Sequence, residues 1–150
     1  MQRLIDGLAR PSLPPLSGRL LRRLDDGVIE RDGSVLLRAL GREAVFDAAR
    51  HVDRTAFECA VNAIEFDAAP LEAERALATA LTYAGQLVEM LDRSGCAGSF
   101  RVILAQDAAD QSCRVSFHRL RPGESSGAED LDAAGDRAIL LLDCGEDSRR

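Results

Sequence analysis

An amphipathic helix predicted over residues 71–94 is the feature that most constrains the fold. Its apolar residues recur at alternating spacings of four and three, which places them on one face of an α-helix. This face consists of Leu77, Leu81, Ala84, Val88 and Leu91. Pro70 suits the first helical turn, and Gly95 suits a left-handed C-cap. A helix of this length extends roughly 36 Å, so it would cover one whole face of a sheet.

Three apolar segments that follow this helix predict three strands. The expected strands span residues 99–106, 112–121 and 137–144. In the second of them, alternation places Cys113, Val115 and Phe117 on one face, as in a half-buried strand. This strand ends at the turn pair Pro122-Gly123. We therefore expect it to be the middle strand of an antiparallel meander.

Residues 57–66 precede the helix and are predicted to form the first strand of the sheet. They are rich in strand formers and contain neither Gly nor Pro. The order of one strand, one long helix and three strands predicts an α+β fold. We expect a βαβββ layer with the long helix packed on a mainly antiparallel sheet, in a main domain over residues 56–150.

Residues 1–55 are expected to form a mostly helical N-terminal segment with a possible short hairpin. Helices are predicted over residues 2–9, 18–24 and 42–52. Three prolines separate the first two helices, because proline lacks the N–H that a helix interior needs. Asp32-Gly33 is a hairpin signal between two short strands. Val45, Ala48, Ala49 and Val52 would form the inner side of the third helix.

The net charge of −6 is unevenly distributed along the chain. Residues 1–57 hold ten Arg against eight acids, whereas residues 58–150 hold nine Arg against 17 acids. An acidic domain repels phosphate backbones, so we expect no nucleic-acid partner. No apolar run is long enough for a membrane helix and the N-terminus has no secretory h-region, so we expect a cytoplasmic protein without membrane contact.

The sequence offers no complete catalytic or metal-binding motif. Two histidines, His51 and His118, lie far apart in the sequence, and no C-x-x-C or phosphate-binding glycine motif occurs. Cys113 and His118 would point to opposite faces of one strand, although Cys144 on another strand could meet His118. We expect no cofactor, no metal and no enzymatic activity. A small enzyme acting through His118 stays open as an alternative.

A polar cluster at the end of the strand over residues 112–121 is the best candidate for partner binding. It contains His118, Arg119, Arg121 and Glu124. The connection that follows, over residues 122–136, carries five acids and no base. We assign the partner-binding residues to His118, Arg119, Arg121, Glu124, Glu129, Asp130, Asp132 and Asp136. The alternative is that these charges only solvate the surface.

Three segments together resemble a known class of protein. They are Val-Asn-Ala-Ile-Glu-Phe over residues 61–66, Val-Ser-Phe-His-Arg-Leu-Arg-Pro-Gly-Glu over residues 115–124, and Ala-Ile-Leu-Leu-Leu-Asp over residues 138–143. With the long helix between the first two, they resemble small bacterial immunity proteins of contact-dependent growth inhibition and other polymorphic toxin systems. The resemblance covers residues 57–145.

This resemblance implies a non-enzymatic cytoplasmic protein that binds and neutralises one cognate toxin domain, often a cationic nuclease. The acidic connection would then occupy the basic cleft of the toxin. A non-catalytic adaptor or scaffold subunit is a further alternative to the His118 enzyme.

The four cysteines generate the first testable prediction. Cys59, Cys96, Cys113 and Cys144 show no disulfide or zinc spacing, and so we expect reduced thiols. Alkylation of the purified, denatured protein followed by mass measurement should count four free thiols. A stable disulfide or stoichiometric zinc would contradict this prediction.

Overall fold

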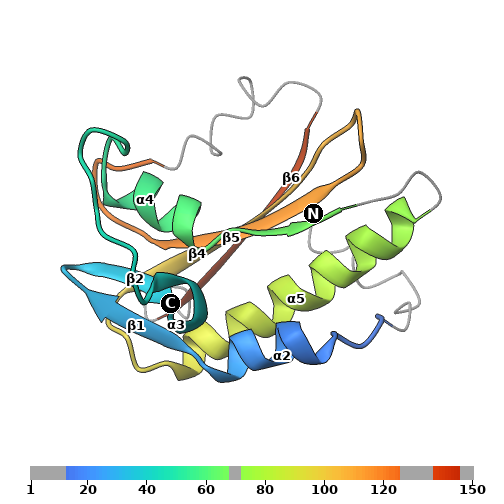
Figure 1. Cartoon of the computed structure of the whole chain (residues 1–150), viewed down its shortest axis with the longest axis horizontal. Helices are drawn as coiled ribbons and strands as arrows, with labels where there is room; N and C mark the ends of the chain where they lie inside the picture. Colours follow the sequence, from blue (N-terminus) through green and yellow to red (C-terminus); the bar gives the residue numbers. More distant parts are fainter. Residues whose placement is uncertain (1–12, 68–71, 126–136, 146–150) are drawn as a thin grey trace.

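The computed structural model describes residues 13–67, 72–125 and 137–145, which form an α+β fold (Figure 1). The helices are α2 (Gly18–Asp25), α3 (Arg38–Gly41), α4 (Arg54–Val61) and α5 (Ala73–Arg93). The strands are β1 (Val28–Arg31), β2 (Ser34–Leu37), β3 (Ile64–Phe66), β4 (Ser99–Gln106), β5 (Cys113–Arg119) and β6 (Ala138–Gly145). Within these described ranges, no helix is both long and apolar enough to cross a membrane.

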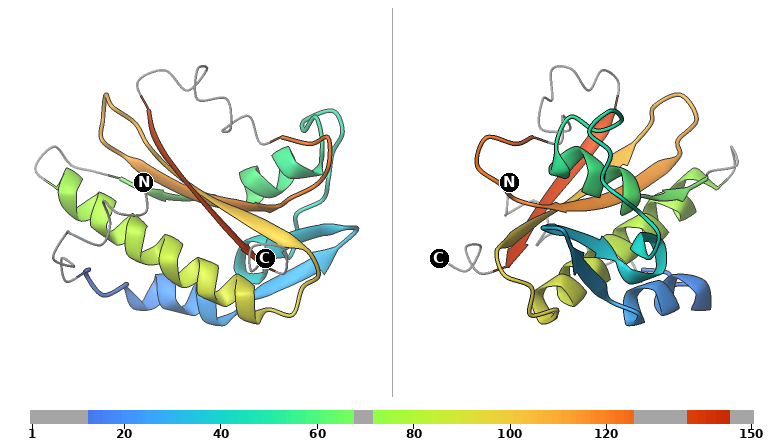
Figure 2. Two further views of the ribbon diagram at one scale, coloured as in Figure 1. Left: turned by 180° about the vertical axis from the view of Figure 1, so that it is seen from behind. Right: turned by 60° about the vertical axis from the view of Figure 1, so that its left-hand side comes forward.

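A four-stranded antiparallel sheet lies at the centre, with the strand order β3-β5-β4-β6. The long helix α5 covers one face of this sheet, and α4 lies on the opposite side (Figures 1 and 2). The hairpin of β1 and β2 forms a separate two-stranded sheet. The predicted α+β class, with a βαβββ order and one long helix on an antiparallel sheet, is confirmed.

The predicted meander is wrong, because β6 pairs with β4 and not with β5. One edge of β5 is taken by β4 and the other by β3, which pairs Ile64 with Val115. β6 therefore pairs with the outer edge of β4, where Phe100 lies opposite Cys144. The long connection after β5 gives the chain enough length to cross to that edge.

The prediction of a strand over residues 57–66 is also wrong for most of its length. Residues 54–61 form α4, and only Ile64–Phe66 belong to a strand. The Asp53 side chain caps α4 by accepting a hydrogen bond from the Ala56 N–H at 2.7 Å. The buried face of α4 carries polar residues. The helical period of this segment is therefore not visible in its apolar residues, which are the ones that indicate a buried face.

The helix predicted over residues 42–52 is absent. The chain forms only the short α3 before it and then turns, with Val45 73% and Val52 90% exposed. Ala48 and Ala49 are exposed as well. These apolar residues have no surface to pack against, so their helical spacing gains no stabilisation from burial. Phe46 is the exception in this loop, and its ring lies 5.7 Å from that of Phe57.

The N-terminal segment otherwise follows the sequence expectation. Ser17 caps α2 by accepting from the Leu20 N–H, and Asp32 and Gly33 form the hairpin turn with φ values of 50° and 78°. The helix predicted over residues 2–9 lies outside the described residues. The boundary near residue 55 stays a prediction, although Val35 and Leu37 share one core cluster with the main sheet.

The buried face of α5 is rotated slightly from the predicted stripe. Its buried residues are Ala76, Ala80, Tyr83, Ala84, Leu87 and Leu91. Leu77, Leu81 and Val88 flank this line and are partly buried against the core. The small residues let α5 lie close to the sheet, where Phe100, Val102 and Phe117 are buried.

The burial difference along α5 predicts unequal effects of two identical substitutions. Leu87 is 0% exposed, so Leu87→Ala should destabilise the fold by about 2–5 kcal/mol through lost burial and a residual cavity. Leu81→Ala removes the same atoms from a partly buried position and should cost less. Urea unfolding of both variants would measure the difference, and equal losses would contradict this packing.

Candidate functional site

The densest polar cluster is organised by the inward face of α4. Thr55, Glu58 and Asn62 follow one another at spacings of three and four, so they lie on one side of the helix and its C-cap. All three are 0% exposed. A buried carboxylate is costly unless charges and hydrogen bonds compensate it, so the contacts of Glu58 decide whether this cluster is stable.

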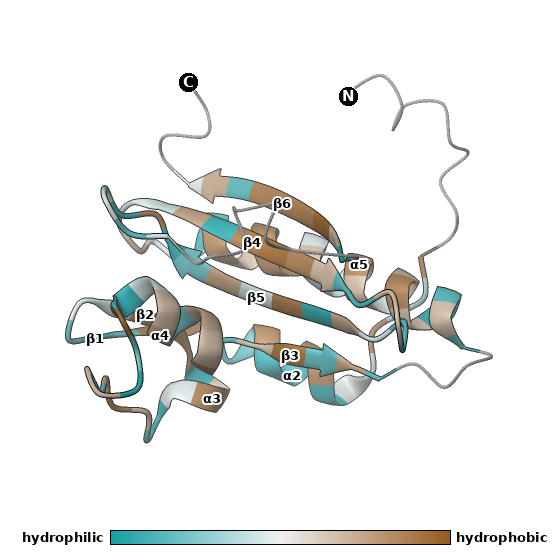
Figure 3. Ribbon diagram, turned by 90° about the horizontal axis from the view of Figure 1, so that it is seen from above, coloured by the Kyte–Doolittle hydropathy of each residue, from teal (hydrophilic) through white to brown (hydrophobic). Residues whose placement is uncertain are grey.

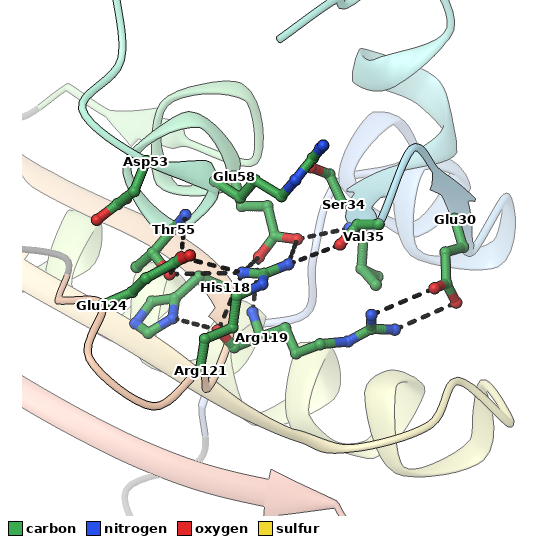
Figure 4. A network of polar contacts seen from close by, with 12 residues as sticks. Glu30, Ser34, Val35, Asp53, Thr55, Glu58, His118, Arg119, Arg121 and Glu124 are labelled. Atoms are coloured by element: carbon green, nitrogen blue, oxygen red, sulfur yellow. Dashed lines mark hydrogen bonds and ion pairs between the residues drawn. The ribbon is translucent and has the colours of Figure 1, made fainter. Parts of the chain in front are cut away.

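The Glu58 carboxylate is saturated by donors from two different strands (Figure 4). Its Oε1 accepts from the Val35 N–H at 2.6 Å, and its Oε2 accepts from the Arg119 N–H at 2.7 Å. The guanidinium of Arg121 donates to both oxygens, at 2.6 and 3.0 Å. One buried side chain therefore joins β2, β5 and the segment that follows β5.

Asn62 satisfies backbone groups of the same two strands. Its Oδ1 accepts from the Leu37 N–H at 2.8 Å, while its Nδ2 donates to the carbonyls of Val35 at 2.9 Å and Phe117 at 3.2 Å. These are edge groups that a neighbouring strand would otherwise pair with. Glu58 and Asn62 thus take the place of a strand between β2 and β5.

Arg121 and Glu124 are brought together by the turn between them. The Glu124 N–H donates to the Arg121 carbonyl at 3.2 Å, and Gly123 has a φ of 79°, which glycine adopts without strain. Glu124 then accepts from the Thr55 hydroxyl at 2.7 Å and from the Thr55 N–H at 3.1 Å. Arg121 also donates to the Gly33 carbonyl at 2.8 Å.

The charges around Arg121 outweigh the cost of burying it. Burial alone pulls its pKa down, but hydrogen bonds and charge from Glu58, together with the charges of Glu124 and Asp53, raise the pKa above its ordinary value. Arg121 therefore remains protonated and compensates the buried Glu58 carboxylate. We name Thr55, Glu58, Asn62, Arg121 and Glu124 the α4 network.

Arg119 extends this region toward the hairpin. Its guanidinium contacts the Glu30 carboxylate at 3.1 and 3.2 Å. The hydrogen bond and the positive charge of Arg119 lower the pKa of Glu30. Because half of the Glu30 side chain is exposed, this ion pair contributes little to stability.

His118 lies on the sheet face opposite α5 and is 1% exposed. Its Nδ1 lies 2.9 Å from the Arg119 carbonyl, which can only accept, so Nδ1 carries the proton. Its Nε2 is buried and has no hydrogen-bond partner among the described residues. Cys144 pairs with Phe100 and lies on the α5 side, so the contact with His118 that the sequence left open does not form.

The structure brings together four of the eight predicted partner-binding residues, but not as a free surface. Arg121 and Glu124 belong to the α4 network, Arg119 contacts Glu30, and His118 is buried. The His118 side chain is therefore not exposed to a partner, and the assignment of these residues to partner binding stays a prediction. The other four residues, Glu129, Asp130, Asp132 and Asp136, lie outside the described residues.

Sequence reasoning missed Thr55, Glu58 and Asn62. The available signal was their helical spacing of three and four, which a search for apolar periodicity passes over. Among the residues that the structure describes, no group of three His, Cys, Asp or Glu side chains is placed to hold a metal ion.

Comparison with known proteins gives one match. A family model described as "Uncharacterized protein PM0498 family" matches residues 2–150, almost the whole chain. No curated protein and no solved structure matches the chain. Function must therefore be inferred from the residues themselves.

The α4 network predicts that Glu58 is among the most sensitive positions of the fold. Glu58→Gln removes the negative charge that compensates Arg121 and leaves buried N–H donors poorly paired, so it should cost about 3–5 kcal/mol. Urea unfolding at neutral pH measures this loss as a lower midpoint with an unchanged slope.

Glu30→Gln is the matched control, because it neutralises a carboxylate in an exposed ion pair with the neighbouring Arg119. It should cost less than about 1 kcal/mol. Equal losses in the two variants would show that the buried network does not organise this region.

Proposed function

We propose that this chain, which belongs to the Uncharacterized protein PM0498 family, is an immunity protein that binds and neutralises a cognate bacterial toxin domain in the cytoplasm. It does so by protein–protein contact, without a reaction of its own. The observation that carries the proposal is that the residue at the start of the acidic connection is held in place by hydrogen bonds to α4.

That residue is Glu124, the first acid of the connection. Its carboxylate is held on the first turn of α4 by two hydrogen bonds to Thr55, and the neighbouring Arg121 is held by Glu58. Between Ser125 and Arg137 the sequence then carries four acids and no base. Four negative charges concentrated in one connection favour a cationic partner through long-range attraction.

The geometry favours binding over catalysis at His118. A general base must reach the proton that it removes, but the His118 ring is 1% exposed and its Nδ1 already contacts a backbone carbonyl. The carboxylate and guanidinium groups of the α4 network likewise satisfy one another. This saturation suits a rigid support for a recognition segment better than it suits a site that exchanges protons with a substrate.

The roles of the predicted contact residues are therefore divided. We assign Glu129, Asp130, Asp132 and Asp136 to the partner contact. Glu124 and Arg121 support the base of the connection from within the α4 network. Arg119 and Glu30 lie at the rim of this region, with about half of the Glu30 side chain exposed, and would adjoin the bound partner.

Stopped-flow association with the toxin domain encoded beside the gene of this protein tests the proposal. The test variant carries Glu129→Gln, Asp130→Asn, Asp132→Asn and Asp136→Asn. It should associate several-fold more slowly than wild type at low ionic strength, because complementary charges mainly raise the association rate. Raising the salt concentration should reduce the difference.

A control variant changes the net charge equally at exposed acids elsewhere. It carries Asp25→Asn, Asp32→Asn, Glu43→Gln and Asp67→Asn, all at exposed positions. Thermal unfolding of both variants should match wild type within about 0.5 kcal/mol. If both variants associate at the wild-type rate, or if no neighbouring toxin domain binds, the assignment is wrong.

A further inference from the structure

The outer edge of β6 is the long sheet edge that lacks a strand partner among the described residues, although at its end the Gly145 N–H donates to the Asp92 carboxylate at 2.9 Å. β6 spans eight residues, all of which pair with β4 on one side. Its other side forms the border of the four-stranded sheet, as the view from above shows (Figure 3). An unpaired edge presents backbone N–H and C=O groups that another strand can bind.

The other sheet edges in the described part of the chain are blocked or short. The Arg38 guanidinium donates to the Val28 carbonyl at 3.2 Å on β1, and α4 side chains satisfy the facing groups of β2 and β5. β3 has only three residues, and its exposed middle residue is the charged Glu65. β6 is long, and its residues 138–142, all of them apolar, have neither protection.

The sequence of β6 is close to self-complementary when it is read against its own reverse. We consider an antiparallel register in which Leu140 lies opposite the same residue of a second copy. The other pairs are then Ile139 with Leu141, Ala138 with Leu142, and Arg137 with Asp143. Each pair joins residues of the same parity, so both side chains project from the same sheet face.

Charge selects this register over its neighbours of equal parity. A register centred on Leu141 would place Ile139 opposite Asp143, and one centred on Ile139 would place Arg137 opposite Leu141. With Leu140 at the centre, apolar residues face apolar residues and an Arg faces an Asp at each end. Opposite charges across strands stabilise antiparallel pairing, whereas a charge opposite an aliphatic side chain does not.

The side chains at these positions are accessible in the single chain. Leu140 is 38% exposed. The Asp143 side chain is 41% exposed, although both of its oxygens already accept hydrogen bonds from Arg101, at 2.6 and 2.7 Å. The Arg137 side chain is 61% exposed and lies 3.6 Å from Asp107. A carboxylate accepts several hydrogen bonds, so Asp143 can receive Arg137 of a second copy beside Arg101.

We propose that a second copy of this chain binds the β6 edge, forming a two-fold symmetric dimer with one continuous eight-stranded sheet. Leu140 lies on the two-fold axis, and the Arg137–Asp143 contact forms twice. A two-fold interface uses the same surface of both chains, which a self-complementary strand provides. This inference is independent of the proposed function, because it involves neither the acidic connection nor the α4 network.

Sedimentation velocity and light scattering of the full chain over a concentration series test the dimer. Wild type should be a dimer that dissociates on dilution. Leu140→Lys places two like charges on the axis and should weaken dimerisation by about tenfold or more. Leu21→Lys is the matched control, since Leu21 is 39% exposed on α2, and this variant should remain dimeric.

Oxidative cross-linking tests the register. Leu140→Cys should form a covalent dimer on mild oxidation, because directly opposed residues of antiparallel strands lie within disulfide reach. Leu21→Cys and the oxidised wild type are the controls and should not cross-link at this edge. Failure of Leu140→Cys to cross-link in a dimeric sample would overturn the register.

A second variant, Arg137→Glu, tests the same interface if Leu140→Lys fails to fold. Arg137→Glu alters an exposed position and should weaken the dimer, whereas Asp107→Asn removes the intramolecular Arg137–Asp107 contact and should not. A wild-type chain that is monomeric at every concentration overturns the proposal. A dimer that neither Leu140→Lys nor Arg137→Glu weakens overturns it as well.

Discussion

The Glu58 carboxylate is the interaction on which the rest of this structure depends. It is fully buried and accepts hydrogen bonds from β2, from β5 and from both terminal nitrogens of Arg121. Removing two charges from water is costly, and good geometry with several further donors is needed to offset that cost. With Asn62 beside it, Glu58 holds a small hairpin sheet against a larger sheet that shares no strand with it.

This arrangement explains why the polar cluster seen in the sequence is a support and not an open site. Arg121 and Glu124 project inward to α4 because the Pro122-Gly123 turn reverses the chain directly after β5. Charges that neutralise one another in the interior are not available to a partner, so under the proposed function recognition falls to the acidic connection. The acidic connection starts beside Glu124, which the α4 network holds in place. It leads into β6, which is held by its pairing with β4.

The apolar part of the fold was accessible from the sequence, because periodicity reports burial directly. The α5 helix, the strands β4, β5 and β6 and the Asp32-Gly33 hairpin each followed from spacing or turn chemistry. The same reasoning failed wherever polar residues are buried or apolar residues are exposed. Residues 54–61 bury Glu58 and Thr55, whereas residues 42–53 leave Val45 and Val52 exposed.

The candidate site was predictable only in part for a related reason. The cluster of His118, Arg119, Arg121 and Glu124 was recognised as polar and close in sequence, but its direction depends on a helix some sixty residues earlier. No local pattern indicates that Arg121 will meet Glu58. The pairing of β6 with β4 is likewise a long-range contact that no local pattern indicates.

The sequence distance between Glu58 and Arg121 also affects the order in which parts of the chain can fold during synthesis. The hairpin and α4 are synthesised first, so Glu58 has no compensating cation until the chain has been extended past residue 121. Until then, the carboxylate is better solvated than buried, and α4 cannot settle between β2 and β5. The packing of α4 between β2 and β5 is therefore expected to form late, after residue 121 has been synthesised.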